Sequence, residues 1–218
     1  MPGATDHHAA LLSALCPGLG QLAQGRRTDA GKAFSITILL LVASLGLGRM
    51  SGRAAEVLFF MILVLPWWAL QSYNAQLGRT DRAITWRGTW GQAWKGGHDI
   101  RFLGLLLFIS AVNDTWIILM NLDYLLPFYC TKPEGLPGFL TKAISPVLHI
   151  TVGYGFMKLR RWSLLVYLVY AAYGLTNGLV NLTCFGPGRI RNTLLVAVIV
   201  STLYILWRRH VLLQTPAQ

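Results

Sequence analysis

Apolar residues in this chain fall into near-continuous runs that are separated by short polar links. Six such runs occur, at about 32–48, 55–75, 101–126, 142–159, 162–183 and 193–207. A helix needs about twenty apolar residues to cross roughly 30 Å of hydrocarbon, whereas a soluble helix keeps a polar stripe along one face. The pattern therefore predicts an all-α integral membrane protein with about six transmembrane helices.

The composition is typical of a membrane protein, but the high positive net charge needs a separate explanation. Hydrophobic residues make up 54% of the chain and charged residues 12%, and the mean hydropathy is +0.50. The net charge of +11 would suit nucleic acid, but no stretch interleaves basic and aromatic residues on a polar surface as a single-strand binder does. Cytoplasmic loops rich in Lys and Arg explain the charge better. We therefore expect no nucleic-acid partner, and expect the lipid bilayer as partner, with anionic lipids at the cytoplasmic face.

The distribution of basic residues predicts the orientation of the spans. With the N-terminus in the cytoplasm, thirteen basic residues lie on that side: Arg26, Arg27, Lys32, Arg79, Arg82, Arg87, Lys95, Arg101, Lys158, Arg160, Arg161, Arg208 and Arg209. The opposite side holds six: Arg49, Arg53, Lys132, Lys142, Arg189 and Arg191. Orientation follows this asymmetry. The sequence thus predicts a multi-pass protein of the bacterial inner (cytoplasmic) membrane with both termini cytoplasmic.

The apolar stretch 11–22 precedes the first run and is broken at Pro17, Gly18 and Gly20. It is no signal peptide, because the first ten residues lack Lys and Arg and so lack the basic region of such a peptide. It is also too short for a full span. We expect a re-entrant or interfacial segment that enters the cytoplasmic leaflet and turns at Pro17-Gly18. The break leaves backbone N–H groups near Gly18 and Gly20 without helical partners. Binding of a lipid phosphate by these N–H groups is the alternative.

Several residues of this region form a motif. They are Leu12-Ser13, Pro17-Gly18-Leu19-Gly20-Gln21, Gly25 and Gly31-Lys32, with Tyr73-Asn74-Ala75 after the second run. The motif resembles the entry sequence of the small two-span "TM two" membrane domains, with Asn74 where an acid is usual. The resemblance implies a helical hairpin with cytoplasmic ends and no enzymatic activity. The remainder resembles uncharacterised bacterial polytopic membrane proteins, which implies topology alone.

The polar segment after the second run carries Trp86, Trp90 and Trp94 at a spacing of four, close to one helical turn. The spacing predicts an interfacial helix with its tryptophans toward lipid, because Trp is enriched at headgroup depth. A docking face for a partner helix is the alternative. We therefore divide the chain into an entry segment with a two-span hairpin (1–80), a cytoplasmic interfacial linker (81–100) and a four-span helical bundle (101–218).

The predicted orientation places Cys130 and Cys184 on the same, non-cytoplasmic side. A disulfide is chemically permitted there if that side is a periplasm. It would tie the loop after the third run to the end of the fifth. Two unpaired thiols near the membrane surface are the equal alternative.

Polar residues inside the runs form a candidate cluster. Asp114 lies thirteen residues past Arg101, about 20 Å into the membrane, where an unpaired carboxylate costs at least ~2.5 kcal/mol. Residues at comparable depth on neighbouring runs predict an intramembrane polar cluster of Asp114, Asn113, His149, Tyr170, Asn177 and Asn181. Interhelical packing is one explanation of the cluster, and a polar cavity that handles protons or solutes is the other.

Motifs for metal, nucleotide or hydrolytic chemistry are missing from the sequence, so we expect no cofactor and no metal site. The leading hypothesis is a non-enzymatic subunit or scaffold of a membrane complex, with other membrane protein subunits as partners. The alternative is a small proton-coupled transporter or channel that uses the Asp/His/Asn cluster. An intramembrane enzyme acting on lipid has the least support.

Overall fold

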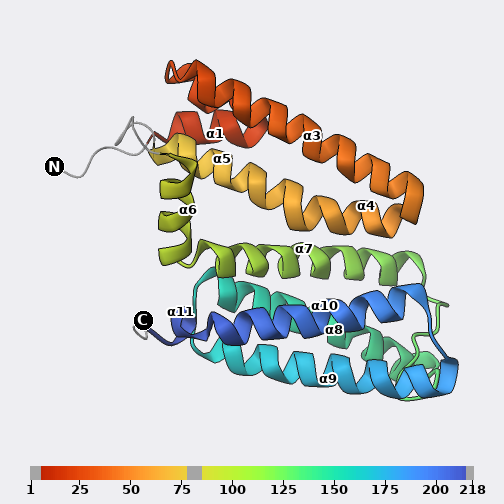
Figure 1. Ribbon diagram of the computed structural model, residues 1–218. Helices are drawn as coiled ribbons and strands as arrows, with labels where there is room; N and C mark the ends of the chain where they lie inside the picture. Colours follow the sequence, from red (N-terminus) through yellow and green to blue (C-terminus); the bar gives the residue numbers. More distant parts are fainter. Residues whose placement is uncertain (1–5, 78–84, 215–218) are drawn as a thin grey trace. The chain divides into compact units, whose positions relative to one another are not determined.

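A computed structural model describes residues 6–77 and 85–214 (Figure 1). Helices make up 83% of the structure, and the described ranges contain no strand. The all-α prediction is therefore confirmed. Within these described ranges, three helical segments are long and apolar enough to cross a membrane, namely Arg27–Met50, His98–Met120 and Trp162–Phe185. Arg79 and Arg82, which entered the charge count above, lie outside the described residues.

The helices divide into two compact units, Met1–His98 and Asp99–Gln218. The Trp-rich segment expected as a linker thus belongs to the first unit. That unit contains α1 (His7–Leu15), α2 (Leu19–Ala23), α3 (Arg27–Ser51), α4 (Arg53–Phe59), the π-helix η1 (Phe60–Val64), α5 (Leu65–Leu77) and α6 (Trp86–Lys95). Within it, α3 packs against α4, η1 and α5 as a hairpin, and α1 lies along α5 (Figure 1).

The second limb of this hairpin continues through Pro66. Proline has no N–H, and in an α-helix its ring meets the carbonyl of residue i−4, which here is Ile62. Ile62 lies in the π-helical turn Phe60–Val64, whose wider i→i+5 spacing suits such a position. The helix that carries Pro66 therefore contains a π-helical turn just before this proline.

The second unit contains α7 (His98–Met120), α8 (Gly135–Met157), α9 (Trp162–Phe185), α10 (Arg189–Trp207) and α11 (Arg209–Gln214). Its core is formed by Ile100, Val152, Phe156, Leu159, Tyr167, Ala171, Ile205 and Leu212. The α7 and α8 backbones approach closely at two glycines: a Cβ on Gly104 would lie 2.6 Å from the carbonyl oxygen of Gly153. Small residues allow such contact between membrane helices.

Two helix boundaries differ from the apolar runs. The third run was expected to reach about residue 126, but α7 ends at Met120, and α8 begins at Gly135 rather than near 142. The segment between them makes a tight turn in which Phe128 and Thr131 exchange backbone hydrogen bonds of 2.9 Å. Apolar composition alone did not separate this loop from the helix before it.

One end of the second unit is joined by a buried ion pair. Arg208 donates from Nε and Nη2 to the two carboxylate oxygens of Asp99, at 2.6 and 2.8 Å. Tyr204 donates to the same carboxylate at 2.8 Å. The hydrogen bond with Asp99 raises the pKa of Arg208 above its ordinary value, so the guanidinium stays charged. The pair fixes the start of α7 to the end of α10.

Candidate functional site

The second unit brings a carboxylate, an imidazole and a phenol from three helices into one hydrogen-bonded chain. Asp114 on α7 lies 3.1 Å from His149 on α8, measured between Oδ2 and Nδ1. The other ring nitrogen of His149, Nε2, lies 2.8 Å from the hydroxyl of Tyr170 on α9. Ser145 also donates to Asp114 Oδ2, at 3.1 Å. His149 is 7% exposed, so the imidazole is shielded between the helices.

This arrangement can hold a proton in more than one position. With Asp114 ionised, His149 donates from Nδ1 to the carboxylate and accepts at Nε2 from Tyr170. With the proton on Nε2 instead, His149 donates to the Tyr170 oxygen and accepts at Nδ1 from a protonated Asp114. A histidine between two oxygen partners suits proton storage and transfer, because both nitrogens take part.

The structure brings together three of the six residues proposed for this cluster. Asn113 is exposed on α7. Asn177 and Asn181 lie on α9 but bind the loop before α8: they accept at 2.9 Å from the backbone N–H groups of Tyr129 and Cys130 respectively. These two loop residues have positive φ values of 43° and 65°, and the asparagines fix this uncommon conformation.

Ser145 is a member of the site that the sequence analysis missed. It lies four residues before His149 on α8, and residues at that spacing share one helix face. This spacing is the signal in the sequence that identifies Ser145 as a neighbour of His149.

Cys130 and Cys184 form a disulfide with their Cα atoms 5.6 Å apart. It joins the loop to the last turn of α9, beside the contact of Asn181 with Cys130. Cys16 remains a free thiol. The loop is thus fixed by a covalent bond and by two asparagines at the same end of α9.

In the first unit, the entry motif forms the break between α1 and α2. Gly18 has a φ of +100°, a left-handed conformation that glycine adopts without a steric cost. Gly20 lies against α1, because a Cβ there would be 2.0 Å from the carbonyl oxygen of Ala9. Its N–H donates at 3.0 Å to the hydroxyl of Ser13. Ser13 and the two glycines therefore hold α2 folded back on α1.

Gln21 connects this break to the second limb of the hairpin. Its Oε1 accepts from Ser13 at 2.8 Å, and its Nε2 donates to the backbone carbonyl of Gln71 at 2.9 Å and to Asn74 Oδ1 at 3.2 Å. Ser13, Gln21, Gln71 and Asn74 are all 0% exposed. We call these four residues the entry network. It satisfies one backbone group at the break, the Gly20 N–H bound by Ser13, whereas Gln71 Nε2 within the network is buried without a hydrogen-bond partner.

The entry network extends to α6. Asn74 donates from Nδ2 to Thr89 Oγ1 at 2.8 Å and accepts from Arg26 Nη2 at 3.0 Å. Gln71 and Thr89 were not predicted as site residues, and Asn74 was named only as part of the motif. The sequence did carry a signal for Gln71 and Asn74. Both are amide side chains within an apolar run, and they lie about one helical turn apart.

The three tryptophans of α6 do not share one environment. Trp86 packs edge-on against Trp67 of α5, with ring centroids 5.0 Å apart. Trp90 is 51% exposed, and its ring centroid lies 6.2 Å from that of Trp94. Trp86 is thus part of the packing of α6 on α5, while Trp90 presents an aromatic surface outside it.

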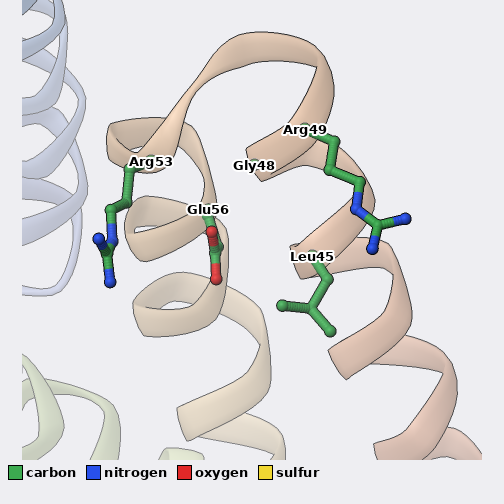
Figure 2. A pocket seen from close by; sticks show the side chains of 5 residues that line it. All are labelled: Leu45, Gly48, Arg49, Arg53 and Glu56. Carbon is green, nitrogen blue, oxygen red and sulfur yellow. The ribbon is translucent and has the colours of Figure 1, made fainter.

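A hollow of about 360 Å³ lies at the turn between α3 and α4. Figure 2 shows Glu56 between the two helices, with the Arg49 and Arg53 side chains extending from either limb of the hairpin. Gly48 leaves space for the Glu56 carboxylate, since a Cβ there would lie 2.4 Å from Glu56 Oε2. The Glu56 side chain therefore helps to close the hairpin at this end.

Comparisons with family models, with curated proteins and with solved structures gave no match to this chain. Within the residues that the structure describes, no group of three or more His, Cys, Asp or Glu side chains is placed to hold a metal ion. The assignment of a function therefore rests on the geometry of the chain itself.

Substitution of Gly20 by Ala should destabilise the first unit. The added methyl would overlap the Ala9 carbonyl, and overpacking of this kind costs about 1–3 kcal/mol. Gly31→Ala is the matched control, because a Cβ at Gly31 meets no described atom within 4 Å. We expect a lower thermal unfolding midpoint in detergent for Gly20→Ala alone; equal midpoints for the two variants would contradict the close packing of α2 on α1.

Alkylation of the unfolded chain should distinguish the three cysteines. Without reduction we expect one modified thiol, that of Cys16, because the other two are joined. After reduction all three cysteines should react. Intact-mass measurement gives the count directly, and three modified thiols without reduction would show that the disulfide does not form.

Proposed function

We propose that this chain is a multi-pass protein of the bacterial inner membrane with six spans and both termini in the cytoplasm. Three spans correspond to α3, α7 and α9, whose length and composition suit a membrane. A fourth is α10, with the apolar segment Arg191–Trp207. The other two are the limb Arg53–Leu77 and α8, which is as long as α7 but carries Lys142, Ser145 and His149.

We further propose that the first unit is a hairpin of the "TM two" type. The supporting observation is that residues of the motif contact one another: Ser13, Gly20 and Gln21 are joined by hydrogen bonds, and Gln21 reaches Asn74. The departure at Asn74 has a physical counterpart. An acid there would face Arg26, which in this chain donates to Asn74 at 3.0 Å and forms a salt bridge of 2.9 Å with Asp29.

The function that the geometry supports best is that of a non-enzymatic subunit or scaffold in a membrane complex. One observation carries it: the long apolar helices leave most of their surface uncovered. In α3, α7 and α9, 22%, 11% and 17% of the apolar window is buried. Such surfaces suit lipid and neighbouring membrane helices, and other membrane protein subunits are the proposed partners.

Proton-coupled transport is the second candidate, and the chain of Asp114, His149 and Tyr170 favours it. Ionisable residues within membrane helices are costly and mark proton or ion pathways in many proteins. Here the carboxylate and the imidazole are in direct contact at 3.1 Å. A purely structural contact between α7 and α8 would not require groups that titrate.

Native mass spectrometry after extraction in a mild detergent tests the subunit role. We expect a second polypeptide at a fixed ratio to this chain. Asp114→Asn is the matched control, because Asp114 contacts residues of its own unit and its loss should leave the ratio unchanged. A chain that runs alone or only as a homo-oligomer would contradict the subunit role.

A further inference from the structure

Two basic side chains lie over the ring of Phe185 at the loop end of the second unit. Lys132 Nζ is 5.3 Å from the ring centroid, and Arg191 Cζ is 5.9 Å from it. Cations are attracted to an aromatic face at such distances. The ammonium and the guanidinium are therefore at most about 11 Å apart, the sum of these two distances.

Lys132 reaches the ring because its loop is fixed to the end of α9. It follows Cys130 by two residues, and Phe185 follows Cys184 directly. The disulfide between the two cysteines joins the loop to the helix, and Asn181 accepts from the N–H of Cys130 at 2.9 Å. These bonds keep the Lys132 side chain beside Phe185.

Arg191 approaches the same ring from the start of α10. Its Nη1 donates to the backbone carbonyl of Gly186 in the turn after α9, and α10 packs along α9. Three segments that are separate in the sequence thus meet at Phe185: the loop before α8, the end of α9 and the first turn of α10.

These two cations have no acidic partner in the part of the chain that the structure describes. The salt bridges there involve Asp29, Asp99 and Asp114. Glu134 lies two residues after Lys132 but forms no ion pair with it. Because like charges repel, an anion bound by Lys132 and Arg191 together would stabilise their position at one ring.

The surroundings of the two cations suit the headgroup of a lipid. Phe185 is the last residue of an apolar helix long enough to cross a membrane, and its side chain is 40% exposed. Leu194 is also exposed. It lies three residues after Arg191, hence on the same face of α10 and one turn further into the apolar segment. An acyl chain can lie along Leu194 while its phosphate meets the cations.

We propose that Lys132 and Arg191 bind the phosphate of an anionic phospholipid in the non-cytoplasmic leaflet. The proposal rests on the membrane-spanning arrangement proposed above and adds a lipid site to the subunit role. The cation–π contacts at this exposed ring are weak, whereas hydrogen bonds from Lys or Arg to a phosphate are strong. Both side chains can therefore move from the ring to the phosphate at little cost.

Titration of the delipidated full-length protein with phosphatidylglycerol, followed by native mass spectrometry, tests this site. We expect saturable binding that is about fivefold weaker in Lys132→Gln and in Arg191→Gln, the effect of one basic residue at an anionic lipid surface. Arg53→Gln is the matched control, because it removes one exposed charge from the same predicted side of the membrane. Its affinity should equal that of the wild type.

Two further probes identify the ligand. Phosphatidylcholine should bind more weakly than phosphatidylglycerol, because its choline cation neutralises the phosphate. Soluble glycerol phosphate should not displace the lipid, because it has no acyl chain to lie along Leu194. Displacement by glycerol phosphate at equal concentration would show a site for soluble anions and overturn the assignment to lipid.

Two other results would overturn the site: equal affinity for phosphatidylglycerol in the wild type and Lys132→Gln, or equal weakening in Arg53→Gln. Thermal unfolding of each variant is measured alongside. If Arg191→Gln unfolds early, Lys132→Gln decides the outcome, because the Lys132 side chain is exposed and bonds to no described residue beyond its contact with Phe185. The subunit ratio from native mass spectrometry does not depend on these two cations, so the two proposals fail separately.

Discussion

The constraint on which this structure depends is that polar groups buried away from water must find partners inside the chain, as the buried side chains of the described residues do apart from Gln71 Nε2 and Trp86 Nε1. A helix that breaks in an apolar environment frees backbone amides and carbonyls, and each unpaired group costs about 1–3 kcal/mol. In the first unit, the break at Pro17 and Gly18 lies beside the entry network of Ser13, Gln21, Gln71 and Asn74. In the second, the loop turn at Tyr129 and Cys130 is held by the amide side chains of Asn177 and Asn181.

This constraint explains why particular residue types occupy particular positions. Gln21 both accepts from Ser13 and donates to α5, a combination that a carboxylate or an ammonium group does not offer. Gly20 is small because Ser13 and the Ala9 carbonyl approach it. The entry motif thus turns a short helix back against the hairpin of the first unit.

Much of the helical architecture follows from the sequence, because apolar runs and their Gly, Pro and basic ends determine where helices lie. The site was predictable in part. Asp114, His149 and Tyr170 were placed together from their depth along each run, and they do lie together. Asn177 shares a helix face with Tyr170. Depth along a helix does not reveal, however, that the loop between α7 and α8 folds back and contacts Asn177. The loop boundary at Met120 was missed for the same reason: the apolar residues after it belong to a turn fixed by tertiary contacts.

The central claim is a six-span chain with both termini in the cytoplasm. Single cysteines introduced in a Cys16→Ser background, and a membrane-impermeant maleimide applied to intact cells, test it most directly. Arg53→Cys and Glu134→Cys should be labelled, while Arg87→Cys and Lys158→Cys should react only after the cells are opened; all four positions are exposed in the structure. Labelling of Arg87→Cys or Lys158→Cys in intact cells would contradict the account.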